Sequence, residues 1–182
     1  VAVAQSDGPW AFLGILPLLD PPRPDAKSTI AQAREYGVQV KMVTGDNVAI
    51  ARQISLELDM GANIQPATEL FPGDVTKGQI PLDAVEKIEQ ADGFAQVFPE
   101  HKYAIVKILQ ENGHIVGMTG DGVNDAPALQ RADIGVAMGV TGSDVAKEAS
   151  AMVLLDDNFA TIVHAVREGR RISDNIRRFI RY

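Results

Sequence analysis

The stretch with the clearest chemical potential is "MTGDGVNDAP", residues 118–127, where Asp121 and Asp125 stand four positions apart. An apolar strand pattern precedes the first acid, and Asn124 or Asp125 can cap a helix that has Pro127 near its start. Capping explains one acid but not both, because neighbouring carboxylates repel unless a cation or proton lies between them. Carboxylate oxygens, waters and a phosphate suit Mg²⁺, so the stretch predicts a magnesium site, with a structural turn as the alternative.

Two further groups follow strand patterns and could receive a phosphate. Thr44, Gly45 and Asp46 precede a helical pattern, so a hydroxyl, a glycine amide and a helix N-terminus meet there. The triplet alone favours the simpler interpretation of a strand-to-helix turn with an N-cap. Lys102 lies near the start of a later helix, where a lysine opposes the helix dipole unless an anion is close. A surface lysine is the commoner alternative, and the neighbouring His101 is interpreted as a surface or packing residue.

The elements that must position these groups alternate between strand and helix. Strands are predicted near residues 11–19, 38–43, 94–97, 114–119, 133–137 and 151–155, and helices near 24–36, 47–59, 82–91, 100–112, 125–131, 143–149 and 158–181. This order predicts an α/β fold, a Rossmann-like doubly wound parallel sheet with ligands at the carboxyl ends of the strands. Residues 61–80 are rich in Gly and Pro without a sustained period, which predicts an ordered loop or small insertion.

Composition and charge exclude several classes of function. At 182 residues the chain suits one domain, and no apolar run approaches the roughly 18 residues that a membrane span requires. The absence of cysteine excludes disulfides and thiolate metal sites. Residues 161–182 contain six arginines and two acids and therefore carry a charge of +4. Because the net charge of the chain is −7, residues 1–160 carry −11. The acidic body argues against nucleic-acid binding, whereas the basic tail could meet a membrane surface or a partner, or be a solvated helix face.

Several motifs resemble, in order and spacing, those of the P-type ATPases, cation pumps whose phosphorylation domain has the haloacid-dehalogenase-like fold. They are "DPPRPD" (20–25), "MVTGD" (42–46), "FPEHKYAIVKILQ" (98–110), "MTGDGVNDAPAL" (118–129) and "DDNFATIVHAVREGRRI" (156–172). The resemblance covers nearly the whole chain. It implies a single haloacid-dehalogenase-like domain that is a segment of a larger, multi-pass membrane protein and lies on its cytoplasmic side.

The resemblance implies roles for the groups that could bind a phosphate. Thr44 and Gly45 would hold the phosphoryl group, and Asp46 would order the site. Lys102 would neutralise phosphoryl charge.

The same resemblance implies a metal site and a nucleotide contact. Asp121 would be the Mg²⁺ carboxylate, with Asn124 and Asp125 supporting the metal and the phosphate. Residues 20–23 resemble the hinge where the chain returns from the nucleotide-binding domain, which would place Arg23 near ATP. The implied cofactors are therefore Mg²⁺ and ATP, the latter as substrate.

By the same resemblance, residues 1–19 end the nucleotide-binding domain, residues 20–160 form the second part of the phosphorylation domain, and residues 161–182 begin a stalk helix that leads towards a transmembrane helix. The remaining domains of the pump and the membrane would be the partners of this segment, with no nucleic acid involved.

The phosphorylated aspartate of the family, in the motif Asp-Lys-Thr-Gly, is not in this sequence. The chain alone is therefore not expected to hydrolyse ATP. Asp20 and Asp156 are poor substitutes, because the phosphatases of this fold need an acid or a hydroxyl two residues further on. Pro22 and Asn158 occupy those places.

Local similarities point to different cations. "ADGFAQVFPEHKY" and "LDMGANI" look like plasma-membrane proton pumps, whereas "GSDVAKEASAMVLLDDNFATIV" is more similar to calcium and sodium pumps. H⁺ is the favoured cargo, with Ca²⁺ or another cation as the alternative. Two hypotheses from other classes are a free-standing soluble phosphatase of the same fold and a non-enzymatic module that binds a membrane surface through its arginine tail.

Overall fold

Short strands and longer helices alternate along the chain in the computed structural model, which describes residues 2–5, 11–15, 21–73 and 81–181. The strands are β1 (Ala2–Gln5), β2 (Ala11–Ile15), β3 (Met42–Val43), β4 (Ile64–Pro66), β5 (Gly93–Ala95), β6 (Gly117–Gly120), β7 (Ile134–Met138) and β8 (Met152–Leu154). The helices are α1 (Ala26–Glu35), α2 (Val48–Glu57), α3 (Ala67–Leu70), α4 (Leu82–Gln90), α5 (Pro99–Glu111), α6 (Ala126–Arg131), α7 (Asp144–Ala149) and α8 (Phe159–Ile180), with a 3₁₀ turn, η2 (Val123–Asp125).

Side-chain caps fix where three of the helices begin. The side chains of Asn47, Ser143 and Asn158 accept a backbone N–H two or three residues further on, at 3.0, 3.2 and 2.9 Å respectively. Such caps satisfy amide groups that have no partner inside a helix, and each contributes roughly 1 kcal/mol. The sharp starts of α2, α7 and α8 therefore follow from the local sequence.

The strands after the β1–β2 hairpin form two parallel sheets of three strands each, in the orders β3-β5-β4 and β6-β7-β8. Met42 and Ile64 both pair with Gly93 at the centre of the first sheet. In the second sheet, Gly117 pairs with Ile134. The predicted α/β class and parallel strands are confirmed, and the strands are arranged in two sheets. Among the described strands none bonds to both β3 and β6, so the sheet is divided between them.

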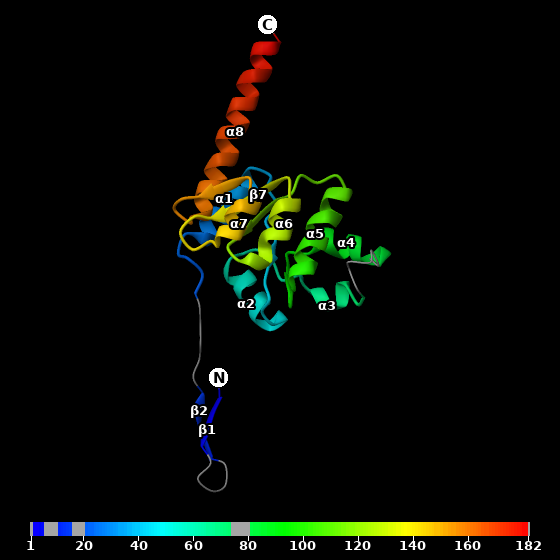
Figure 1. Cartoon of the computed structure of the whole chain (residues 1–182), viewed down its shortest axis with the longest axis vertical. Helices are drawn as coiled ribbons and strands as arrows, with labels where there is room; N and C mark the ends of the chain where they lie inside the picture. The colour runs from blue at the N-terminus through cyan, green and yellow to red at the C-terminus, as the bar shows by residue number, and fades with distance from the viewer. Residues whose placement is uncertain (1, 6–10, 16–20, 74–80, 182) are drawn as a thin grey trace.

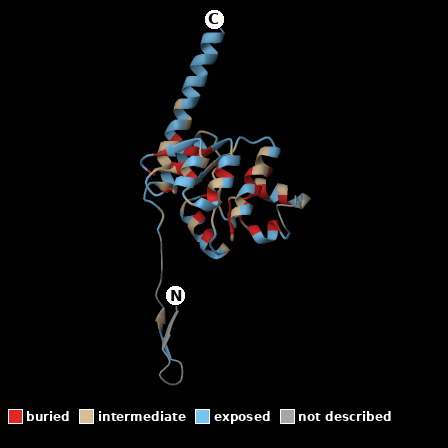
Figure 2. Ribbon diagram, in the orientation of Figure 1, coloured by how far each residue is buried: buried red, intermediate tan, exposed pale blue. Residues whose placement is uncertain are grey.

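The largest buried cluster lies where α3, α4 and α5 pack around β5. Phe94, Ile88 and Ile108 are its fully buried large side chains, and burial of each such side chain stabilises the fold by roughly 1.5–3 kcal/mol. The second sheet has a smaller cluster built on Leu129 and Ala137. Figure 2 shows the buried residues gathered within this helix-and-sheet body. The core thus anchors one face of α5, the helix that carries Lys102.

Part of the predicted loop at residues 61–80 is regular structure. It contains β4 and α3, which place Ile64, Ala67 and Leu70 in the core. A strand of three residues followed by a helix of four is too short to produce a hydrophobic period, which explains why sequence reasoning missed it. Residues 74–80 lie outside the described part of the chain.

Two elements extend from the body. The β1–β2 hairpin lies apart from it, and α8 projects from it over much of its length (Figure 1). Residues 169–181 of this projection are all exposed, and Val163 is the buried residue of α8 (Figure 2). In the described part of the chain, no helix is both long enough and apolar enough to span a membrane. The predicted strand at 11–19 is described only as β2, and residues 16–20 lie outside the described part.

Candidate phosphoryl and metal site

Thr44 and Asp46 form a tight turn between β3 and α2. The Thr44 hydroxyl accepts the Asp46 N–H at 3.1 Å and donates to Asp46 Oδ2 at 3.0 Å. Gly45 and Asp46 are exposed, and the N-cap Asn47 begins α2 directly afterwards. The Thr44 hydroxyl is thus engaged with Asp46, whereas the exposed Gly45 lies next to a helix N-terminus, where backbone amides can receive an anion. The structure confirms the predicted strand–turn–helix order.

Lys102 and Asp125 form an ion pair between α5 and the turn after β6. Lys102 Nζ lies 2.6 Å from Asp125 Oδ1, and the two side chains are 19% and 8% exposed. The other oxygen of Asp125 accepts the Gly122 N–H at 3.1 Å. Asp125 therefore closes the 3₁₀ turn. It stands at the N-cap position of α6, as one of the two predicted candidates, but its side chain makes no capping hydrogen bond to that helix. The position of Lys102 near a helix start predicted a nearby anion, and in this structure that anion is the carboxylate of Asp125.

The turn between β5 and α5 connects these two groups. The Gln96 N–H donates to the carbonyl of Asp46 at 2.9 Å, and the Val97 N–H donates to the carbonyl of Thr44 at 3.1 Å. Gln96 adopts a left-handed conformation with φ 54°, which is uncommon for a residue other than glycine. Helix α5 starts two residues after Val97, so the Thr44 turn and the Lys102 helix are linked by the backbone. Nothing in the sequence pattern marks Gln96 for this position.

Asp121 is exposed at the end of β6, and its carbonyl accepts the Ser143 N–H at 2.8 Å. Its carboxylate makes no hydrogen bond or ion pair with the described residues, and the exposed Asn124 side chain makes none either. Within the described ranges no three Asp, Glu or His side chains cluster as a metal cage. One accessible carboxylate beside a second, paired one fits Mg²⁺, which takes one or two carboxylates and keeps waters and phosphate oxygens as its other ligands.

His101 packs rather than reacts, as its sequence context indicates. It is buried, stacks on Phe71 with ring centroids 5.3 Å apart, and its Nδ1 accepts the Phe98 N–H at 3.3 Å. Burial lowers its pKa, so the ring is neutral at pH 7. Through these contacts His101 helps to hold the start of α5 in place.

The remaining predicted residues lie away from the ion pair in the chain. Arg23 is exposed, and its carbonyl accepts the Ala26 N–H at the start of α1. Asp156 accepts the Thr161 hydroxyl at 2.7 Å and the Asn158 N–H at 3.2 Å, and these bonds, the first most of all, lower its pKa. Asp156 therefore stabilises the start of α8. Asp20 lies outside the described residues.

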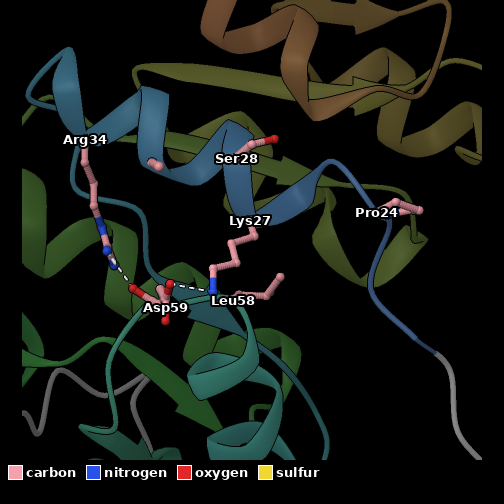
Figure 3. Close-up of a pocket in the computed structure, with 7 residues that line it drawn as sticks. Pro24, Lys27, Ser28, Arg34, Leu58 and Asp59 are labelled. Atoms are coloured by element: carbon pink, nitrogen blue, oxygen red, sulfur yellow. Dashed lines mark hydrogen bonds and ion pairs between the residues drawn. The ribbon is translucent and has the colours of Figure 1, made fainter.

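A pocket of about 420 Å³ lies away from this site. It lies between α1 and the end of α2, where Lys27 and Arg34 point towards Asp59 (Figure 3). Lys27 is paired with the Asp59 carboxylate at 2.6 Å, and Arg34 donates to the Asp59 carbonyl at 2.6 Å. The ten residues of α2, about 15 Å of helix, separate this pocket from Asn47. Because of this separation, the pocket does not extend the candidate phosphoryl site.

Comparisons with known proteins agree with the α/β fold. A model of the haloacid dehalogenase-like hydrolase family matches residues 2–133. Over 181 residues the chain is 48% identical to the calcium-transporting ATPase of Bacillus subtilis (strain 168), an alignment that covers 100% of this chain and 20% of that protein. The chain thus spans about a fifth of the length of this curated relative. Among solved structures, the catalytic domain of the CPx-ATPase CopB-B is similar, with 28% identity and a TM-score of 0.58, over 80% of this chain and 45% of that one.

Proposed function

The chain belongs to the haloacid dehalogenase-like hydrolase family, and on that premise we propose that it is the Mg²⁺- and phosphate-binding part of the phosphorylation domain of a P-type cation pump. The observation that carries this proposal is the Lys102–Asp125 ion pair, which lies beside the exposed Asp121 on one side and is linked through the β5–α5 turn to Thr44 on the other. The 48% identity, over 181 residues, to part of a calcium-transporting ATPase supports it.

Each site residue then has a proposed task. Thr44 and Gly45 bind the phosphoryl oxygens, and Asp46 keeps the Thr44 hydroxyl in place through their mutual hydrogen bonds. Lys102 has three N–H donors, so it can keep Asp125 and still neutralise a phosphoryl oxygen. Positioning and charge neutralisation of this kind supply most of the catalysis of phosphoryl transfer.

Asp121 is proposed as the Mg²⁺ carboxylate, with Asn124 and Asp125 as its support. The metal would neutralise charge on the phosphoryl oxygens while they are transferred. Arg23 is proposed to contact the nucleotide, and residues 161–182 to lead towards the membrane as a stalk. These roles follow from the family resemblance and are compatible with the exposure of Asp121, Asn124 and Arg23.

The nucleophile in this proposal is an aspartate supplied by another segment of the pump. Its carboxylate oxygen attacks the γ-phosphorus of ATP, ADP leaves, and water later hydrolyses the aspartyl phosphate to release inorganic phosphate. The divided sheet supports this arrangement, because β3 and β6, the strands that lead to Thr44 and Asp121, each have an edge without a described partner strand. A strand received between those edges would end beside both groups.

For the transported cation, we propose Ca²⁺ ahead of H⁺. The motifs near Lys102 resemble proton pumps, but the 48% identical relative is named as calcium-transporting. The two cargoes differ in a measurable way, since Ca²⁺ at micromolar concentration would be required for phosphorylation of a calcium pump by ATP, whereas a proton pump needs no added cargo ion.

The test is acid-stable phosphoenzyme formation from ATP by the full-length protein that contains this segment. We expect Asp121→Asn to abolish the Mg²⁺-dependent signal, while Asp144→Asn, which changes a 97% exposed acid on α7, retains it. Wild-type levels of phosphoenzyme in Asp121→Asn would refute the assignment. Phosphorylation that is unchanged by removal of Ca²⁺ with a chelator would refute the calcium cargo alone.

A further inference from the structure

Asp157, in the turn between β8 and α8, receives more hydrogen bonds from the protein than any residue of the phosphoryl site. Its carboxylate accepts the Val140 N–H at 2.9 Å, the Thr141 N–H at 2.7 Å and the Thr141 hydroxyl at 2.9 Å. The residue is buried and adopts a left-handed conformation with φ 50°. Such backbone strain at a buried acid persists only where the surrounding contacts compensate for it.

The loop that Asp157 holds, residues 139–143, connects to the metal side of the site. It follows β7, and its last residue, Ser143, donates its N–H to the carbonyl of Asp121 at 2.8 Å. At its other end, the Gly139 N–H donates to the carbonyl of Leu154 at 2.8 Å. The loop therefore lies between the end of β6, where Asp121 is exposed, and the segment that leads into α8.

Asp157 is also adjacent to the first residues of α8. Asn158 is the N-cap of that helix, and Asp156 holds Thr161 in its first turn. One short segment, residues 156–158, thus binds the 139–143 loop with its middle residue and fixes the start of α8 with its outer two. The hydrogen bonds from Val140 above all, and those from Thr141, lower the pKa of Asp157 to about 2, so its carboxylate is ionised at neutral pH.

We infer that Asp157 is a positioning residue that holds the 139–143 loop, and through Ser143 the backbone of Asp121, in fixed relation to the start of α8. The inference rests on the proposed function, in which Asp121 binds Mg²⁺. A continuous series of hydrogen bonds thus joins the backbone of Asp121 to the start of α8. Mutation of residues that orient a metal ligand typically costs about 10–100-fold in metal affinity or activity.

The first experiment uses the full-length protein and measures phosphoenzyme formation from ATP against Mg²⁺ concentration. Asp157→Asn replaces an accepting oxygen by an NH₂ group that cannot accept the Thr141 hydrogens. We expect the half-saturating Mg²⁺ concentration to rise about tenfold. The matched control is Asp156→Asn, which alters the adjacent acid without a contact to the 139–143 loop, and its half-saturation should stay at the wild-type value. Equal Mg²⁺ dependence in the two variants and the wild type would overturn the inference.

Two Thr141 variants keep the test informative if Asp157→Asn fails to fold. Thr141→Val removes one of the three donors to Asp157, and we expect a smaller rise of about threefold in half-saturating Mg²⁺, whereas Thr141→Ser retains the hydroxyl and should restore the wild-type value. A purely structural role would reduce the amount of folded pump in Thr141→Val without a shift in Mg²⁺ dependence, which would count against the inference.

Hydrogen exchange of the full-length protein separates this inference from the proposed function. In Thr141→Val and Asp157→Asn we expect faster exchange in peptides that cover residues 139–144, and in Asp156→Asn unchanged exchange there. Unchanged exchange in all three variants overturns the inference even if the wild type forms phosphoenzyme. Absence of phosphoenzyme from the wild type refutes the proposed function, and the exchange data then decide alone whether Asp157 holds the loop.

Discussion

Lys102 Nζ lies 2.6 Å from Asp125 Oδ1, so the cation at the start of α5 is neutralised by the acid that follows β6. The pair joins the two halves of the divided sheet, because α5 follows the first sheet and Asp125 follows the first strand of the second. Under the proposed function, a phosphoryl group that binds here would meet an ammonium that Asp125 already holds in position. Preorganisation of this kind lowers the cost of binding, since the lysine loses little conformational freedom at that moment.

Removal of the Lys102 cation should destabilise the fold. Lys102→Met leaves the buried Asp125 carboxylate without its partner, and we expect the free energy of unfolding to fall by about 2 kcal/mol, less than for a fully buried pair because Lys102 is partly exposed. Urea denaturation measures this change. Lys107→Met is the control on the same helix, since its pair with Glu111 is exposed and 3.7 Å long. It should change stability by less than about 0.5 kcal/mol, and equal losses in the two variants would contradict the prediction.

Two glycines of β6 provide a matched pair of substitutions. A Cβ atom at Gly120 would lie 2.6 Å from Asp125 Cβ, whereas one at Gly117 would lie 3.8 Å from its nearest neighbour, the carbonyl of Ile134. Gly120→Ala must displace Asp125 from Lys102, so we expect a loss of about 1–3 kcal/mol in stability and a large loss of phosphoenzyme in the full-length protein. Gly117→Ala should be close to neutral in both assays. Similar behaviour of the two variants would show that Asp125 is not constrained by Gly120.

The Thr44 hydroxyl should matter more for activity than for stability. Thr44→Val removes the acceptor of the Asp46 N–H, but this turn is exposed and water can replace the bond, so the loss of stability should stay below about 1 kcal/mol. Phosphoenzyme formation should slow roughly a hundredfold, because the substitution removes one hydrogen-bond donor to the phosphoryl oxygens, and loss of one such donor typically has an effect of this size. Thr44→Ser retains the hydroxyl and should keep most of the rate. A full rate in Thr44→Val would exclude Thr44 from the phosphoryl site.

The ionisation of Asp157 predicts a stability change in acid. The pKa of its carboxyl is lowered to about 2 in the folded protein, against about 3.9 in unfolded chains. Its contribution to stability is therefore complete above about pH 4 and is lost as the pH falls towards 2. Denaturation between pH 5 and pH 2 should show a steeper loss for the wild type than for Asp157→Asn. The neighbouring Asp156, whose pKa is also lowered, titrates in both proteins. The Asp157 charge raises the Asp156 pKa in the wild type only, so the contribution of Asp156 cancels in part from the difference.

The sequence was sufficient to predict the strand-to-helix turns that carry the site. The turn at Thr44, the position of Lys102 near a helix start and the turn at Asp121 all follow strands, as predicted, because short polar caps and glycines specify such turns locally. The ion pair between Lys102 and Asp125 could not be predicted as a pair, since it depends on how α5 packs against the second sheet. The roles assigned to Asn124 and Arg23 remain predictions.

What sequence reasoning missed depends on tertiary contacts. Sequence reasoning assigns no role to Asp157, since its partners Val140 and Thr141 lie sixteen or seventeen positions away in the chain. The left-handed Gln96 carries no signal, because its conformation is imposed by the bonds of the adjoining turn. The division of the strands into two sheets was not predicted, because the sequence pattern indicates where strands lie but not which strands pair with one another.

The two half-sheets also differ in how far apart their paired strands lie along the chain. Met118 pairs with Gly135, 17 positions away, whereas Met42 pairs with Gly93, 51 positions away. Closure of the longer loop costs about 1 kcal/mol more in chain entropy. Contacts between nearby residues form earlier and faster, so we expect β6, β7 and β8 to assemble before β3 joins β5. The half that carries Asp121 would then be ordered first as the chain folds, and the half that carries Thr44 would follow.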